Sequence, residues 1–458
     1  MKLAILGGGG FRVPLVHRAL LAASAGDGPL AGTSIVLYDP SPDRLAVIEA
    51  VLAQQAQQMQ QAQQAQLAPL VTSTTDLSTA LDGADFVFSA IRVGGLAGRV
   101  SDERVALRLG VLGQETTGPG GIAYGLRTIP VALEIAEQAA RLCPDAWMIN
   151  FTNPAGLITE TMQAVLGDRV IGICDTPAGL VRRAAAALGL PAHDLSPGYA
   201  GLNHLGWLHE LTYQGRDVLP DLLGDDQALA SLEETAMFGA PWLRSLGCLP
   251  NEYLYYYYFN REAIASIRAM ASRGTRGEFL ARQQSEFYAS AAAAPDRALA
   301  LWRAATEERH ALYMAEARPA GTAHESADTD GAGYEAVALA AMEAITGGRS
   351  RPARIILNVR SGGALPGLDD DAVVELPCTV DETGAHPVPA QAPPLSQLGL
   401  MQQVKAVERF TIEAAVTGSP DAALKAFALH PLVDSVPVAR ELLSGYLREI
   451  PEIARVLS

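Results

Sequence analysis

The sequence predicts an α/β protein with an N-terminal doubly wound parallel sheet and a second, mainly helical α+β lobe. Three observations predict this class. Up to residue 173, short apolar runs recur and end at glycine or polar residues, as buried parallel strands do where they end at a cleft. Segments with apolar residues at helical spacing separate these runs. After about residue 200 the alternation gives way to Ala-rich helical patterns, so we expect domains at 1–200 and 201–458.

The apolar runs place the elements in chain order. Parallel strands are expected at 3–6, 34–38, 85–90, 147–151 and 170–173. The Gln- and Ala-rich segment 54–66 is expected to be a solvated crossover helix, because its Ala, Met and Leu positions leave one polar face. In the second lobe we expect helices over 226–346 and 399–457, a strand over 354–360 and a surface loop at 387–394.

Composition and charge limit the classes of partner. The chain has 458 residues, of which 49% are hydrophobic and 18% charged, as is typical of a folded globular protein. Its net charge is −16 and it has no Lys- or Arg-rich run, so we expect neither nucleic acid nor a membrane as its partner. The four cysteines form no CxxC pair, and the N-terminus lacks the regions of a signal peptide. We therefore expect reduced thiols and a cytoplasmic protein.

A glycine-rich turn after the first strand is the candidate nucleotide site. Glycines between a strand and a helix let the backbone approach a pyrophosphate, whose charge the helix N-terminus favours. Arg12 stands where the GxGxxG fingerprint has its third glycine, so a simple tight turn is the alternative. Asp39, at the end of the second strand, favours the ribose hydroxyls of NAD over the extra phosphate of NADP. The sequence thus predicts a Rossmann-like NAD domain whose binding residues are Gly7, Gly9, Gly10, Phe11, Arg12 and Asp39.

Several loops expected at strand ends are dense in glycine and polar residues, as cleft loops are. Two of them carry Cys174 and His204. A thiolate and an imidazole together are good ligands for a divalent metal of borderline softness. A buried cysteine that only packs in the core is the alternative for Cys174.

Four motifs resemble the signature loops of glycoside hydrolase family four, the NAD- and metal-dependent glycosidases. They are GQETTGPGG (113–121), NFTNPAG (150–156), GLNHLGW (201–207) and PNEYLYYYYF (250–259), and the likeness covers nearly the whole chain. It is strongest to the 6-phospho-β-glucosidase branch. The resemblance implies that Cys174 and His204 hold a catalytic Mn²⁺ or another divalent metal. It also implies that Asn150 and Asn153 line the sugar site and that Tyr253 is the base.

The family mechanism makes this set of residues intelligible. The proton at sugar C2 is too weakly acidic for a tyrosinate unless a neighbouring carbonyl takes up the charge. The resemblance implies that NAD-mediated oxidation at C3 supplies this carbonyl, after which C2 loses its proton and the aglycone is eliminated. Addition of water and re-reduction complete the cycle. We therefore expect a glycosidase that hydrolyses 6-phospho-β-glucosides or a related β-glycoside.

The identity of the sugar is left open by one departure from the family pattern. Candidate cations for a C6 phosphate are Arg92, Arg273 and Arg276, since arginine binds phosphate in a bidentate manner. Asp175, however, follows the metal cysteine where the 6-phospho-β-glucosidase branch usually has asparagine. A carboxylate there repels a phosphate unless it is paired, and it could instead hydrogen-bond a hydroxyl or act as a proton donor. The segment 245–251 has no acid, which favours the β-type or an unselective branch.

Two other functions compete with this interpretation. An NAD-dependent dehydrogenase of a small 2-hydroxy acid or sugar would also suit the first 200 residues, but such hydride transfer needs no metal pair. A non-catalytic nucleotide sensor would need neither the metal pair nor Tyr253. The resemblance and the broad helical lobe further predict a homo-oligomer, either a dimer or a tetramer.

Overall fold

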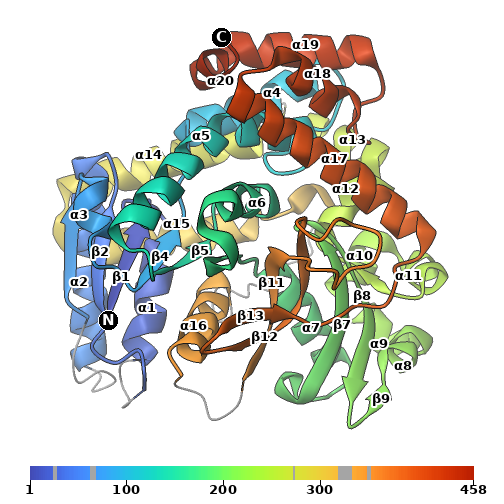
Figure 1. The fold of residues 1–458 in the computed structure, drawn as a ribbon, viewed down its shortest axis with the longest axis horizontal. Helices are drawn as coiled ribbons and strands as arrows, with labels where there is room; N and C mark the ends of the chain where they lie inside the picture. Colours follow the sequence, from blue (N-terminus) through green and yellow to red (C-terminus); the bar gives the residue numbers. More distant parts are fainter. Residues whose placement is uncertain (24–27, 62–68, 272–273, 318–332, 348–351) are drawn as a thin grey trace.

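The computed structural model describes residues 1–23, 28–61, 69–271, 274–317, 333–347 and 352–458. Its strands form one continuous sheet with helices on both faces (Figure 1). In spatial order, the parallel half consists of β3 (Val71–Thr74), β2 (Ser34–Tyr38), β1 (Lys2–Leu6), β4 (Phe86–Ser89), β5 (Trp147–Asn150) and β6 (Val170–Gly172). This is the predicted doubly wound sheet, with one strand that the prediction missed. That strand, β3, lies at the edge and has the sequence VTST, which contains a single apolar residue.

The central strand β1 shows why the sheet needs helices on both faces. Leu3 and Ile5 belong to one apolar cluster, whereas Ala4 and Leu6 belong to another. Successive side chains of a strand point to opposite faces, so a strand that is apolar throughout must be covered twice. The helices that flank the parallel half are α1 (Val13–Ala23), α2 (Pro42–Gln61), α3 (Leu77–Leu81), α4 (Gly95–Arg108), α5 (Pro119–Leu142), α6 (Ala155–Leu166) and α7 (Thr176–Ala187). The expected crossover helix over 54–66 is confirmed as far as Gln61, and the rest lies outside the described residues.

The antiparallel half extends the same sheet. It contains β7 (Leu195–Leu202), β8 (Leu205–Tyr213), β9 (Arg216–Asp217), β10 (Leu249–Pro250), β11 (Ala353–Arg360), β12 (Val373–Asp381) and β13 (Gly384–Pro387). It joins the parallel half where Asn358 of β11 pairs with Gly172 of β6. The motif GLNHLGW was expected to be a loop, but it forms the tight turn and flanking strand ends of the β7–β8 hairpin. Pro and Gly within β7 hid this strand in the sequence.

The second lobe is mainly helical, as predicted, with helices α8 (Leu219–Gly224), α9 (Asp226–Ala230), α10 (Glu233–Phe238), α11 (Ala240–Leu246), α12 (Tyr255–Tyr258), α13 (Asn260–Ala271), α14 (Arg276–Ala293), α15 (Ala298–Ala311), α16 (Tyr334–Ile345), α17 (Leu395–Thr417), α18 (Pro420–Ala428), α19 (Val436–Glu449) and α20 (Pro451–Val456). The helices do not stay apart from the N-terminal half. In Figure 1, α17 to α20 lie over α4 and α5, and the contacts of α17 and α20 with α5 agree. The expected domain boundary near residue 200 therefore stays a prediction. Among the described helices, none is long and apolar enough to cross a membrane.

Candidate active site

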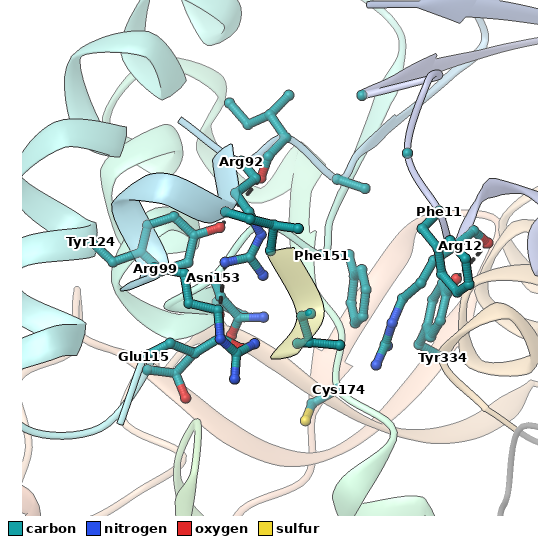
Figure 2. A pocket seen from close by; sticks show the side chains of 18 of the residues that line it. Phe11, Arg12, Arg92, Arg99, Glu115, Tyr124, Phe151, Asn153, Cys174 and Tyr334 are labelled. Carbon is teal, nitrogen blue, oxygen red and sulfur yellow. Dashed lines mark hydrogen bonds and ion pairs between the residues drawn. The ribbon is translucent and has the colours of Figure 1, made fainter. Parts of the chain in front are cut away.

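A cavity of about 720 Å³ lies where the carboxyl ends of the parallel strands meet the second lobe. Figure 2 shows Phe11, Arg12 and Tyr334 on one side of it, and Arg92 with Glu115 on the other. Cys174 lies between the two groups in this view. In an open parallel sheet, ligands bind at this end of the strands. The cavity is therefore the candidate active site.

The glycine turn brings bare backbone to the cavity. Gly7 has φ +82°, a conformation that side chains rarely adopt, and a Cβ at Gly8 would stand 2.6 Å from that of Leu37. The turn is held from outside, since the Trp302 indole donates to the carbonyl of Phe11 at 2.8 Å and the Tyr334 hydroxyl donates to that of Arg12 at 2.8 Å. These donors belong to α15 and α16, far away in sequence. The predicted residues Gly7, Gly10, Phe11 and Arg12 line the cavity.

Asp39 lies where the adenosine ribose of a dinucleotide is expected. Its carboxylate lines the cavity and accepts hydrogen bonds from the backbone N–H of Gly9 at 3.2 Å and of Ser41 at 3.0 Å. Gly9 thus orients the carboxylate and is not itself among the cavity's lining residues. Arg44, which the sequence analysis did not select, lines the same end and lies over the Tyr288 ring. A crowded glycine turn with an acidic residue at the next strand end fits NAD.

Cys174 and His204 line the same cavity from different halves of the sheet. Cys174 follows β6. Burial raises the pKa of its thiol well above the usual value, and the nearby Glu375 and Asp175 raise it further. His204 is in the β7–β8 turn with φ 63°, which is uncommon for a residue other than glycine. Burial lowers the pKa of His204 to about 3, so its imidazole is neutral and has a free lone pair for a metal.

The donor set fits a divalent cation that also binds substrate. In the described ranges, no group of three or more His, Cys, Asp or Glu side chains is arranged to hold a metal. A thiol and an imidazole alone leave most coordination positions for oxygen atoms of a ligand. A cation at this pair would favour the deprotonated thiol, against the effect of burial.

Tyr253 is next to His204, and contacts with His204 and Asn251 hold it in place. It belongs to the 3-10 helix η3 (Glu252–Leu254), where its N–H donates to Asn251 Oδ1 at 3.0 Å. Its ring stacks on that of His204, with 3.6 Å between the centroids and 4° between the planes. Its hydroxyl lies 3.2 Å from that of Tyr313, which donates to Glu252 Oε1 at 2.7 Å. Burial, and then the charge of Glu252, raise the pKa of Tyr253 well above its usual value.

The structure separates Tyr253 from the other tyrosines of the YYYY run. Tyr253 and Tyr256 line the cavity, whereas Tyr255 and Tyr258 pack around the ring of Phe238. Tyr256 donates to Glu316 at 2.6 Å. Of the tyrosines in this segment, Tyr253 is therefore the one whose hydroxyl is suited to act as a base beside the metal pair.

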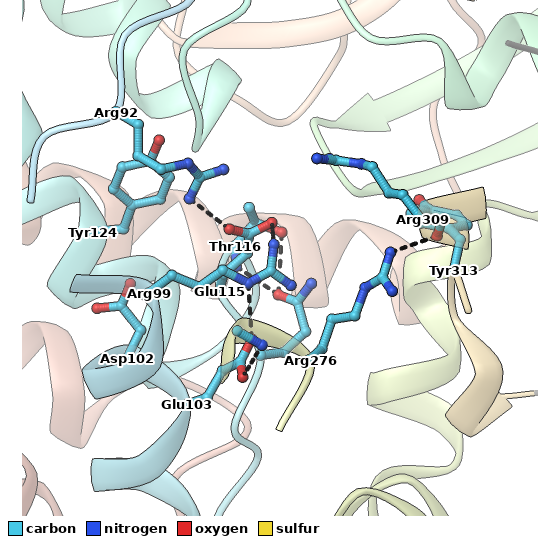
Figure 3. A network of polar contacts seen from close by, with 12 residues as sticks. Arg92, Arg99, Asp102, Glu103, Glu115, Thr116, Tyr124, Arg276, Arg309 and Tyr313 are labelled. Atoms are coloured by element: carbon cyan, nitrogen blue, oxygen red, sulfur yellow. Dashed lines mark hydrogen bonds and ion pairs between the residues drawn. The ribbon is translucent and has the colours of Figure 1, made fainter. Parts of the chain in front are cut away.

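Four arginines, Arg92, Arg99, Arg276 and Arg309, line one part of the cavity (Figure 3). Arg92 and Arg99 both donate to Glu115, at 2.7 and 2.6 Å. Burial alone would raise the pKa of Glu115, but these two guanidinium groups outweigh it and hold the pKa at about 2. Glu115 is thus a firmly ionised carboxylate that fixes both arginines. Neither Arg99 nor Glu115 was selected from the sequence as a site residue, although Glu115 lies within GQETTGPGG.

The other two arginines approach from the second lobe. Arg276 donates from Nη2 to the carbonyl of Arg309 at 2.7 Å, and its Nη1 is buried without a hydrogen-bond partner in the described structure. Burial, and then the charge of Arg99, lower the pKa of Arg276 to about 10. Burial lowers the pKa of Arg309 well below its usual value, and the positive charges of Arg12 and Arg276 lower it further. Buried guanidinium groups that lower one another's pKa favour an anion bound among them. No pattern in the sequence indicated Arg309, because a single arginine in a charged helix is usually solvent-exposed.

The two asparagines of NFTNP have different places. Asn153 lines the cavity, and its Oδ1 is buried with no partner among the described residues, so it can accept from a sugar hydroxyl. Asn150 is not a lining residue of this cavity, so its predicted substrate role stays a prediction. Its side chain is fully buried, donates to Thr152, Ala155 and Thr159, and accepts from the N–H of Thr152. It shapes the loop that presents Asn153. Arg273 lies outside the described residues, and Asp175 lines the cavity beside Cys174.

Known proteins resemble the chain along nearly its whole length. Residues 2–190 match the family described as "Family 4 glycosyl hydrolase", and residues 199–433 match its C-terminal domain. A probable 6-phospho-beta-glucosidase of Bacillus subtilis is 34% identical over 383 residues, which cover 82% of this chain and 80% of the relative. A 6-phospho-alpha-glucosidase of Leptotrichia buccalis is 31% identical over 390 residues, covering 82% of each chain. The Thermotoga maritima 6-phospho-beta glucosidase, solved with manganese, NAD⁺ and glucose-6-phosphate, has a TM-score of 0.79, 25% identity and 99% coverage of both chains.

Proposed function

Because this chain belongs to the family 4 glycosyl hydrolases, we propose that it hydrolyses 6-phospho-β-glucosides or related β-glycosides with NAD and a divalent metal. The family match continues through residues 199–433, and this favours a glycosidase over a dehydrogenase of small 2-hydroxy acids or sugars. Mn²⁺ is the metal of the solved relative. We further propose a cytoplasmic enzyme that works as a dimer or tetramer.

We base the phosphorylated substrate on the Nη1 of Arg276, which is buried without a hydrogen-bond partner among the described residues. A buried guanidinium nitrogen without an acceptor is unfavourable, and a phosphate dianion supplies several acceptors at once. Arg92 and Arg309 line the same cavity, so three guanidinium groups can surround the phosphate. The Asp175 carboxylate, which left this substrate open in the sequence, is opposed by this local positive charge.

The chain's own residues would bind both cofactors. The turn at residues 7–12 and Asp39 would hold NAD, and Cys174 with His204 would hold the metal. When bound, NAD supplies reversible oxidation at sugar C3 and the cation supplies polarisation of the resulting ketone. Asn153 would orient the sugar through its Oδ1, which has no hydrogen-bond partner in the part of the chain that the structure describes.

Tyr253 is the group that removes the proton from sugar C2. Its phenolate oxygen accepts the proton, and Tyr313 and Glu252 fix the direction of that oxygen through their hydrogen bonds. The stack on His204 holds the ring beside the metal pair, where a cation lowers the cost of the phenolate. Without a cation, burial keeps Tyr253 protonated.

A chromogenic 6-phospho-β-glucoside tests the proposed function. The purified enzyme is expected to cleave it only when NAD⁺ and Mn²⁺ are both present. The matching plain β-glucoside and the 6-phospho-α-glucoside are assayed in parallel, and both are expected to react more slowly. Full activity after treatment with a chelator, or a preference for the unphosphorylated sugar, would contradict the proposal.

Replacing Arg276 with glutamine is expected to reduce kcat/KM for the phosphorylated substrate about 10- to 100-fold, because a hydrogen bond to a charged group contributes about 1.5–3 kcal/mol. The plain glucoside is expected to lose much less. Steady-state kinetics on both substrates measure the ratio. Arg261→Gln, at an exposed position on α13, is the matched control and is expected to change neither. An equal loss on both sugars would remove Arg276 from phosphate recognition.

Asp175→Asn separates a proton donor from a group that merely repels phosphate. If Asp175 protonates the leaving group, the variant should lose at least about tenfold more kcat on a methyl glycoside than on a nitrophenyl glycoside, whose leaving group needs no proton. Both substrates carry the 6-phosphate and are compared by their kcat values. If the carboxylate only repels phosphate, the variant should instead gain kcat/KM on both substrates, and the catalytic assignment fails.

A further inference from the structure

A buried carboxylate outside the cavity connects the loops that carry the metal pair and the base. Glu375 lies on β12 with 1% of its surface exposed and is not one of the lining residues. It accepts three hydrogen bonds, from the Tyr199 hydroxyl at 2.9 Å, from Asn203 Nδ2 at 3.2 Å and from Asn358 Nδ2 at 3.1 Å. Three converging donors suit a carboxylate that only accepts.

Two of these hydrogen bonds lead directly to groups of the site. Asn203 precedes His204 in the β7–β8 turn, so the bond to Glu375 ties this turn to β12. The Tyr199 hydroxyl also accepts from Asn251 Nδ2 at 3.3 Å. Asn251 in turn accepts from the N–H of Tyr253. One carboxylate therefore secures both the imidazole ligand and the base.

The third hydrogen bond, from Asn358, connects Glu375 to the strand that leads to Cys174. Glu375 pairs with Gly201 of β7, three residues before His204. Asn358 of β11 pairs with Gly172 of β6, two residues before Cys174. A Cβ at Gly172 would stand only 2.8 Å from that of Asn358, so the two strands are in close contact here. Glu375 thus lies behind the pair, between the strand of each ligand.

We propose that Glu375 is a positioning residue for Cys174 and His204, which holds the His204 turn in place from behind through its hydrogen bonds. Groups that orient metal ligands from behind commonly change metal affinity 10- to 100-fold when they are mutated. This inference rests on the proposed function, because the position matters only if Cys174 and His204 hold a metal.

The test measures metal binding without substrate or turnover. Mn²⁺ is titrated into the NAD-bound enzyme, and free Mn²⁺ is followed by its electron paramagnetic resonance signal. Glu375→Gln keeps the shape of the side chain but replaces one accepting oxygen with an NH₂ group. This NH₂ group then faces side chains that are themselves donors. Its Kd for Mn²⁺ is expected to rise about 10- to 100-fold.

Glu160→Gln is the matched control. Glu160 also accepts three hydrogen bonds, from Lys405, from Arg409 and from the N–H of Val373, which is on the same strand as Glu375. It is not a lining residue of the cavity. A general disturbance of β12 would therefore weaken Mn²⁺ binding in both variants and overturn the proposal, whereas a loss confined to Glu375→Gln supports it.

Asn203→Ala keeps the test open if Glu375→Gln does not fold. This variant leaves the carboxylate in place and removes its link to the His204 turn. We expect a Kd several-fold above that of the wild type. An unchanged Kd in folded Asn203→Ala, or in folded Glu375→Gln, overturns the inference and leaves the proposed function intact. Absence of Mn²⁺ binding by the wild type would instead count against the metal assignment itself.

Discussion

Replacing Tyr253 with phenylalanine is expected to lower kcat about 10²- to 10⁴-fold, the usual contribution of a general base. The phenylalanine ring can keep the stack on His204, so the affinities for NAD and Mn²⁺ should stay close to those of the wild type. The direct measurement is exchange of the C2 proton. A substrate deuterated at C2 should lose its label to water in the wild type and lose it far more slowly in the variant.

Tyr255→Phe is the control for this experiment. Tyr255 is as buried as Tyr253, at 8% against 9% exposed, but it stacks on Phe259 and does not line the cavity. Its variant should exchange the C2 label at the wild-type rate. If Tyr253→Phe retained this exchange while binding both cofactors, another group would have to be the base. Tyr313, whose hydroxyl lies 3.2 Å from that of Tyr253, and Tyr256, which lines the same cavity, would be tested next.

Replacing Cys174 with serine is expected to reduce kcat/KM about 10³-fold or more at subsaturating Mn²⁺. A Lewis acid contributes several kcal/mol, and each 1.4 kcal/mol or so corresponds to a factor of ten in rate. The loss should extend to proton removal, because burial and Glu252 raise the pKa of Tyr253 well above its usual value and a nearby cation would lower it. The chelated wild type should show the same loss of C2 exchange.

Cys143→Ser controls for the loss of a buried thiol. Cys143 is 6% exposed, against 7% for Cys174, and it packs in the core beside α5 rather than at the cavity. Its activity should keep the wild-type dependence on Mn²⁺. The metal assignment fails if Cys174→Ser binds Mn²⁺ as tightly as the wild type, or if chelation leaves the wild type fully active.

The parallel half of the fold was predictable from sequence because its signal is local. Strands buried on both faces are apolar at every position, and Leu3 to Leu6 show this without any knowledge of their neighbours. The β7–β8 hairpin was not predictable in this way. Its strands contain Pro197, Gly198 and Gly201, and only pairing across the sheet keeps them extended. The edge strand β3 was missed because none of its four residues is fully buried and only one is apolar.

The sequence by itself determined the family chemistry of this protein. The glycine turn and Asp39 predict a dinucleotide site from their residue types, and the resemblance to the family implies that Cys174 and His204 hold a metal and that Tyr253 is the base. The structure brings them to one cavity.

Only the tertiary structure decided which polar residues face that cavity. It placed the Asn150 side chain in a buried hydrogen-bond network and added Arg309 and Tyr313 to the residues that line the cavity. It also placed Glu375 behind the cavity, where Tyr199 donates to it. The reason is physical. The role of a charged or polar side chain depends on its burial and on partners that are distant in the chain, such as Tyr199 for Glu375, 176 residues away. No local pattern records those partners.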